Sequence, residues 1–243
     1  KPGPSVRVQV IALGNSGAGQ RKNNEVLKDL AVRFHPDMVL MTLCSNDFCD
    51  DDQALHDERD VYLGQVTPLL RGLLRHRYYV FAFAVRRYAE IRRNTIAVHP
   101  EFLQWASSDD PRIEEAWDRT LSLVKDSRDY CTAYGMGFKL VYLGAELELK
   151  YALDPKDTIE ALGHMGAPYR AITWNMNRSI QRVTRFCVEN HIPLISLLEP
   201  LVKGQKESGK KAFGDHYTFF GHEIAASTLT KALSNDPGFP GRR

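Results

Sequence analysis

The sequence predicts an α/β protein in which helices cover both faces of a parallel sheet. Short apolar runs alternate with amphipathic segments of helical length along the 243 residues. A strand–helix–strand order implies parallel strands joined by right-handed crossovers. The composition, 43% hydrophobic and 26% charged, is ordinary for a globular chain, and the length suits one large domain or two small ones.

Four apolar runs are the predicted strands. Each is short and rich in branched aliphatic residues, which is typical of strands buried on both faces of a sheet. The first run is closed by a glycine, and the second is followed by polar residues. The predicted strands are Val6–Leu13, Met38–Leu43, Lys139–Leu143 and Pro193–Ser196.

Amphipathic segments between the strands are the predicted helices. In the first of them, apolar residues recur every three to four positions, and the residue before Pro36 ends the pattern because it avoids the helical region. The acidic stretch Asp47–Asp60 is expected to be a loop, in which Asp50, Asp51 and Asp52 are exposed to solvent. The predicted helices are Asn23–Phe34, Val66–Arg93, Pro111–Tyr134, Tyr169–Asn190 and about His222–Leu233.

We expect residues 1–234 to form one domain, with residues 235–243 as a frayed tail. Residues 50–108 do not follow the regular alternation, so we expect a helical cap or lid inserted there. The basic and aromatic stretch Arg71–Arg93 indicates either a nucleic-acid surface or a pair of amphipathic helices with solvated arginines. We favour the helices and no nucleic-acid partner, because the net charge is only +2 and acidic residues come just before.

Other classes of protein are disfavoured by the sequence. The longest apolar run, Tyr78–Val85, is far shorter than the about 20 residues of a membrane-spanning helix. The four cysteines show neither a CxxC pair nor a zinc-ligand spacing, so we expect them to be small buried side chains. We expect no metal and no cofactor. The cellular compartment, cytoplasmic or exported, stays open.

The loop Gly14–Gln20 follows the first predicted strand, and three interpretations of it compete. A phosphate-binding loop would need Lys and Ser or Thr where Gln20 and Arg21 stand. A nucleophile elbow would need glycine at Ala18. The third interpretation is an oxyanion-binding loop, in which Gly17 lets its backbone N–H approach a substrate oxygen.

Two further loops carry candidate residues. Asn46 and Asp47 follow the second predicted strand, where an amide N–H could hold a developing oxyanion while the carboxylate fixes the loop. The alternative is an ordinary turn in which both side chains bond their own backbone. His216, next to Asp215, is a candidate general base, whereas His222 is expected to be structural.

Three blocks in this order resemble signature blocks of the SGNH (GDSL-like) hydrolase family, and the resemblance covers nearly the whole chain. Leu13–Gly19 is similar to the second block and Ser45–Asp47 to the third. Asp215–His216, followed by Gly221–His222, is similar to the last.

The resemblance implies a flavodoxin-like three-layer fold and a serine esterase. In this family the oxyanion is held by groups that match the N–H of Gly17 and the amide of Asn46, and His216 matches the base. The implied substrate is a small-molecule or carbohydrate ester, with O-acetyl or another O-acyl group. A transferase acting on the same acyl-enzyme, or a binding domain without activity, are the alternatives.

The sequence departs from the family pattern at the nucleophile. The family's Gly-Asp-Ser block does not occur before Gly14, and Ser16 only superficially mimics it. We therefore expect the serine upstream of Lys1, on a strand that fills a gap between Val6–Leu13 and Met38–Leu43.

The carboxylate partner of the base departs from the pattern as well. The family places Asp two or three residues before the histidine, where this chain has Gly214 and Phe213. Asp215 is adjacent to His216, and adjacent side chains tend to diverge. The orienting group is therefore Asp215 after distortion of the loop, a backbone carbonyl or another acid.

Overall fold

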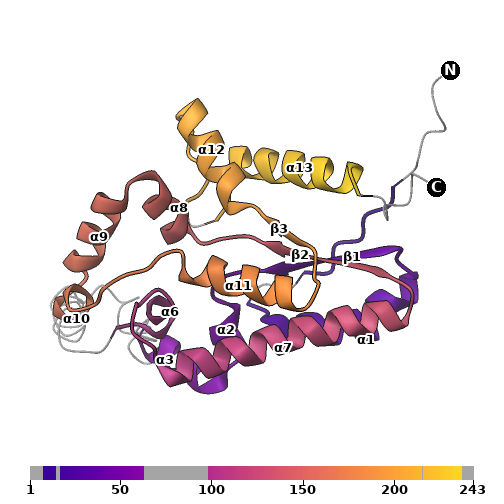
Figure 1. The fold of residues 1–243 in the computed structure, drawn as a ribbon, viewed down its shortest axis with the longest axis horizontal. Coiled ribbons are helices and arrows are strands. Elements are labelled where there is room, and N and C mark those ends of the chain that lie inside the picture. The colour runs from indigo at the N-terminus through magenta and orange to yellow at the C-terminus, as the bar shows by residue number, and fades with distance from the viewer. Residues whose placement is uncertain (1–7, 15–16, 63–97, 215, 237–243) are drawn as a thin grey trace, which may run out of the picture.

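The computed structural model describes residues 8–14, 17–62, 98–214 and 216–236. Within them, three parallel strands form one sheet in the order β1 (Met38–Leu43), β2 (Gly137–Tyr142) and β3 (Leu194–Ser196) (Figure 1). The register pairs Met38 with Gly137 and Leu140 with Leu194. The predicted α/β class with a parallel sheet is confirmed, and so are three of the four predicted strands.

The prediction of a strand at Val6–Leu13 is wrong for its described part. Residues 8–14 belong to no strand, and Val10 is 84% exposed and Val8 55% exposed. Residues 6 and 7 lie outside the described residues. The run has the β-branched composition of a strand, but a strand also needs a neighbour that supplies hydrogen bonds. In the described part of the sheet, no strand pairs with this segment.

One edge of β1 is open in the described sheet, because β1 pairs with β2 on one side only. Val39, Met41 and Leu43 pack into the core on one face of the strand. On the other face Leu40 is 37% exposed. Near the end of the strand, the carbonyl oxygen of Thr42 accepts a hydrogen bond of 2.8 Å from Gln20 Nε2.

The predicted helices appear with shifted ends. The first becomes α1 (Gln20–Asp29) and the 3-10 turn η1 (Ala31–Phe34). The next described one is α7 (Pro111–Ala133), which begins after Asp110, whose side chain accepts the N–H of Arg112. The last is α13 (Phe219–Ser234). Val66–Arg93 lies outside the described residues.

The predicted helix Tyr169–Asn190 is wrong in its first half. A short helix α10 (Ala167–Arg170) is followed by an irregular stretch, and α11 spans only Arg178–Glu189. The stretch between them bonds to another segment, with Asn175 N donating to Trp105 O at 2.7 Å and Ser107 N to Thr173 O at 2.8 Å. These bonds replace the i to i+4 bonds that a continuous helix would make.

Further helices were not predicted. Two of them, α2 (Asp47–Asp50) and α3 (Gln53–Tyr62), lie where a solvated acidic loop was expected, so that expectation is wrong. The described parts of the expected cap, residues 50–62 and 98–108, also contain α6 (Pro100–Leu103). The others are α8 (Glu146–Leu153), α9 (Pro155–His164) and α12 (Leu198–Ser208).

Helices cover both faces of the sheet, as predicted. On one face α1, α7 and α11 pack on the strands around a core that includes Leu27, Trp117 and Val183. On the other face α8, α12 and α13 enclose Leu149, Leu201 and Ala225 (Figure 1). The polar loops that follow the strands therefore gather at one end of a three-layer arrangement.

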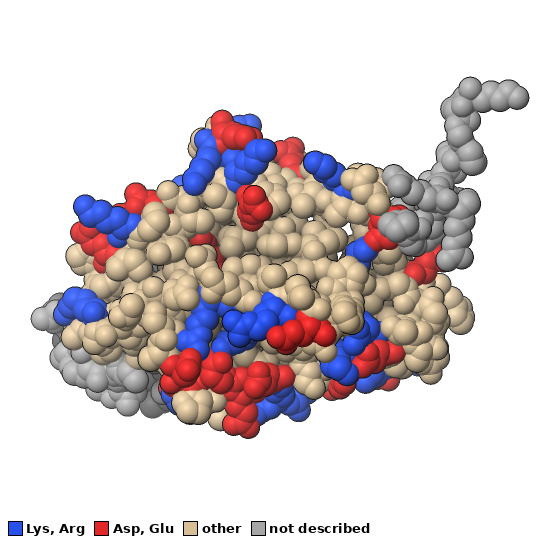
Figure 2. Space-filling view, in the orientation of Figure 1, with Lys and Arg blue, Asp and Glu red and all other residues tan. Residues whose placement is uncertain are grey.

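The surface carries mixed charge where it is described. Figure 2 shows basic side chains lying among acidic ones on this face. Among the described residues, oppositely charged side chains form pairs such as Arg178–Glu114 at 2.9 Å and Arg112–Glu58 at 3.1 Å. None of the helices searched, which are those of the described residues, is long and apolar enough to cross a membrane. The four cysteines are free thiols, three of them buried, as expected.

Candidate functional site

The N-terminus of α1 is capped by a buried carboxylate from a distant part of the chain. Asp51 accepts the backbone N–H of Gln20 at 3.0 Å, the N–H of Arg21 at 2.8 Å and the hydroxyl of Thr120 at 2.8 Å. It is only 4% exposed, so the expectation of a solvated side chain is wrong for this residue. Because Asp51 takes these two N–H groups, the loop before α1 does not offer them to a phosphate.

The loop after β1 is held by a second buried carboxylate. Asp47 is 5% exposed and accepts the N–H of Cys44 at 3.0 Å and Gln20 Nε2 at 2.5 Å. Burial raises the pKa of Asp47 to about 7, although both hydrogen bonds favour its charged form. Asp47 therefore fixes the loop, which is compatible with both sequence interpretations, and Gln20 joins this loop to the start of α1.

Asn46 lies at the surface end of the same loop. Its Nδ2 donates to Asp50 Oδ2 at 3.1 Å, and Asp50 Oδ1 lies 3.6 Å from His56 Nδ1. A side-chain amide carries two hydrogens on its nitrogen. The bond to Asp50 uses one of these hydrogens and orients the group.

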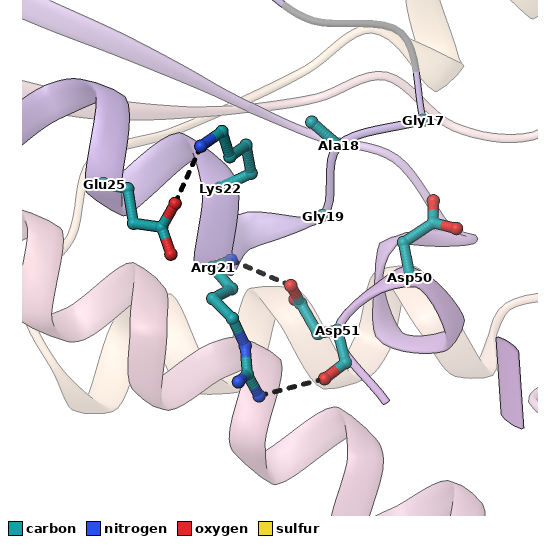
Figure 3. A pocket seen from close by; sticks show the side chains of 8 residues that line it. All are labelled: Gly17, Ala18, Gly19, Arg21, Lys22, Glu25, Asp50 and Asp51. Carbon is teal, nitrogen blue, oxygen red and sulfur yellow. Dashed lines mark hydrogen bonds and ion pairs between the residues drawn. The ribbon is translucent and has the colours of Figure 1, made fainter. Parts of the chain in front are cut away.

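Gly17 and Asp50 line one cavity of about 420 Å³ (Figure 3). Gly17 has φ +68°, in the left-handed region that favours glycine, which explains the residue type at this position. The cavity thus brings the loop of Gly17 together with the residue that holds Asn46, from segments far apart in the chain. Its lining residues are Gly17, Ala18, Gly19, Arg21, Lys22, Glu25, Asp50 and Asp51.

The charged side chains around this cavity are already partly paired with one another. Lys22 Nζ lies 2.9 Å from Glu25, and Arg21 Nη2 donates to the backbone oxygen of Asp51 at 3.3 Å (Figure 3). Among the lining residues described, the largest apolar side chain is the methyl group of Ala18. Ser16, the alternative nucleophile, lies outside the described residues.

His216 is exposed at the tip of a loop between α12 and α13. The loop is closed by a bridge between Phe213 and Tyr217 and by Gly214 N donating to His216 O at 2.8 Å. Asp215 lies outside the described residues, so its relation to the imidazole stays a prediction. The structure thus places the expected base on a short, closed loop.

No family model, curated protein or solved structure matches this chain. The functional argument therefore rests on the geometry of the described residues and on the three sequence blocks.

Sequence reasoning missed a third buried carboxyl group, that of Glu148 in α8, the helix that follows β2. Glu148 is 2% exposed and accepts the hydroxyl of Tyr142 at 2.7 Å, the indole N–H of Trp105 at 3.2 Å and the N–H of Ala145 at 2.9 Å. Burial raises its pKa. The only sequence signal was a glutamate three residues into a helix, where it can bond the preceding N–H.

A metal site is not found in the described part of the chain. No group of three or more His, Cys, Asp or Glu side chains there is arranged to hold an ion. Cys44, beside the loop of Asn46, is also a poor nucleophile because burial raises the pKa of its thiol to about 12.

Proposed function

We propose that this protein is a serine acyl hydrolase of the SGNH type, which acts on a small-molecule or carbohydrate ester. One observation carries the proposal. Gly17 and Asp50 line the same cavity, and Asp50 accepts a hydrogen bond from the amide of Asn46, which supports a common site for the two expected oxyanion donors although Asn46 is not among the lining residues. Donors fixed in this way stabilise a tetrahedral intermediate without reorganising during the reaction.

In the proposed reaction, His216 takes the proton of a serine hydroxyl, which attacks the ester carbonyl carbon. The carbonyl oxygen becomes an oxyanion and accepts the N–H of Gly17 and one amide hydrogen of Asn46. The protonated His216 returns its proton to the leaving alcohol. Water, activated by the same base, then releases the acid and regenerates the serine. Asp50 orients the amide of Asn46 through the bond of 3.1 Å.

The finer fold that we propose has one more parallel strand beside β1, with the serine at its carboxyl end. Residues 38–43 read MVLMTL, without the charges or prolines that protect natural edge strands. Such a run, apolar at five of its six positions, is typical of a strand paired on both sides. The exposed residues 8–13 would be the other neighbour of that strand. A serine at its carboxyl end would lie at the same end of the sheet as Asn46.

The test uses the full-length protein. We expect it to hydrolyse p-nitrophenyl acetate and to be labelled by a fluorophosphonate on one serine. Asn46→Ala should lower kcat by about 10² to 10³, the usual cost of one oxyanion donor. Asn177→Ala, at an exposed asparagine, is the matched control and should keep full activity.

Equal kcat for the two variants would refute the role of Asn46. The labelled serine, located by peptide mass spectrometry, identifies the nucleophile. Labelling of Ser16 would place it in the glycine-rich loop and refute the extra-strand assignment of the serine. If the natural protein neither reacts with the probe nor hydrolyses the ester, the proposal of an acyl hydrolase fails and a binding domain replaces it.

A further inference from the structure

Tyr217, the residue after the expected base, anchors its loop to the sheet. Its hydroxyl donates to the backbone oxygen of Leu143, directly after β2. Its ring packs edge-on against Phe213, with centroids 5.0 Å apart, and against His222 at 5.8 Å. Tyr217 is thus held by a hydrogen bond at its tip and by rings on its sides.

Two hydrogen bonds in series connect this loop to the strand that leads to Asn46. The first is the bond from Tyr217 to Leu143 O. The second runs from Leu143 N to Leu43 O, at 3.0 Å, and joins the ends of β2 and β1. Leu43 is the last residue of β1, and the loop with Asn46 follows it. The carboxyl end of the sheet therefore connects the loop with His216 to the loop with Asn46.

The base of the loop is fixed independently by Thr218. Its N–H donates to Ala212 O at 3.1 Å, and its hydroxyl donates to Lys211 O at 2.7 Å. The hydroxyl oxygen also accepts the N–H of Gly221 at 3.2 Å, at the start of α13. A Cβ at Gly221 would lie 2.1 Å from Ala212 O, so glycine permits this closure. Thr218 therefore attaches the loop to the start of α13, whereas Tyr217 attaches the loop to the end of β2.

We propose that Tyr217 is a positioning residue for His216, because its hydroxyl bond to Leu143 sets where the imidazole stands relative to the oxyanion donors. This inference rests on the proposed function. Catalysis is sensitive to such placement, since a shift of about 1 Å can cost about 100-fold in rate. His216 itself is exposed and its backbone oxygen is held by Gly214 N, so the packing of Tyr217 next to it is a further restraint on its position.

The test is a double-mutant cycle on kcat for p-nitrophenyl acetate, measured with the full natural protein. Tyr217→Phe removes only the hydroxyl, and we expect kcat to fall about 10-fold with little change in KM. In a His216→Ala background the same substitution should have no further effect, because the group that it positions is gone. Tyr130→Phe is the matched control, since the Tyr130 hydroxyl also donates to a backbone oxygen, that of Lys28 at 3.4 Å.

A second variant keeps the test decisive if Tyr217→Phe folds poorly. Thr218→Ala loosens the same loop at its other anchor and should also lower kcat only while His216 is present. An equal fall of kcat in both backgrounds, or no fall in either, would overturn the positioning role. A His216→Ala variant with full activity would instead refute His216 as the base, and the proposed mechanism with it.

Discussion

Asp51→Ala is the substitution that most directly tests how the site is assembled. The carboxylate of Asp51 is 4% exposed and accepts two N–H groups at the start of α1, those of Gln20 and Arg21, together with the hydroxyl of Thr120 on α7. Alanine would leave these three donors without this acceptor. The loop that carries Gly17, directly before α1, would lose one of its attachments to the β1–α2 region, while the bonds from Gln20 to Thr42 and Asp47 remain.

The magnitude follows from the two kinds of bond that are lost. Removing a helix N-cap acceptor costs about 0.5 to 2 kcal/mol of stability. Leaving a buried hydroxyl such as that of Thr120 unsatisfied costs about 1 to 3 kcal/mol more. We therefore expect Asp51→Ala to lower the free energy of unfolding by about 3 kcal/mol, a large part of the about 5 to 15 kcal/mol of a typical domain.

Urea unfolding, followed by far-UV circular dichroism and by the fluorescence of the three tryptophans, measures this loss. Glu25→Ala is the control, because Glu25 is an exposed acid whose pair with Lys22 contributes little. Asp51→Asn should fall between the two, since its amide keeps one acceptor oxygen. A loss below about 1 kcal/mol for Asp51→Ala, equal to that of Glu25→Ala, would refute the capping argument.

Two further predictions concern the same region. Gly19→Ala should destabilise the protein by about 1 to 3 kcal/mol, because its Cβ would lie 2.3 Å from Asp51 Oδ1, and the cost should largely vanish in an Asp51→Ala background. Asp47 has its pKa raised from 3.8 to about 7, so the folded state keeps a proton that the unfolded chain releases. Stability should thus fall as pH rises from about 4 to 7, by at most about 1.4 kcal/mol per pH unit, and then level off. Asp47→Asn should flatten that slope in unfolding curves measured at several pH values, and an unchanged slope would assign it to another group.

The elements that the sequence predicted well are those whose signal is local. Met38–Leu43 is apolar except for Thr42, and the structure makes it a strand. The helix at 111–133 begins with Asp110 and Pro111, which supply a cap and a favourable first turn without help from the rest of the chain. Gly17 has a φ of +68°, which accounts for glycine there, whereas the predicted approach of its N–H to a substrate oxygen stays a prediction.

The errors have a common cause, which is contact between distant segments. Residues 8–13 have the composition of a strand, yet pairing depends on a neighbour that composition does not reveal. The acidic run looked solvated because nothing local shows that Asp51 meets α1 and Thr120. The break before α11 arises from backbone bonds to residues 105–107.

The sequence by itself determined the α/β class, the order of its main elements and the residue types of a candidate hydrolase site. Periodicity, capping residues and glycine at a positive φ act over a few neighbouring residues, so they can be read directly. The tertiary structure decided which carboxylates are buried, which strand edge stays open among the described residues, and that Tyr217 ties the loop of His216 to the sheet. Those features depend on partners far away in the chain, and only folding brings them within bonding distance.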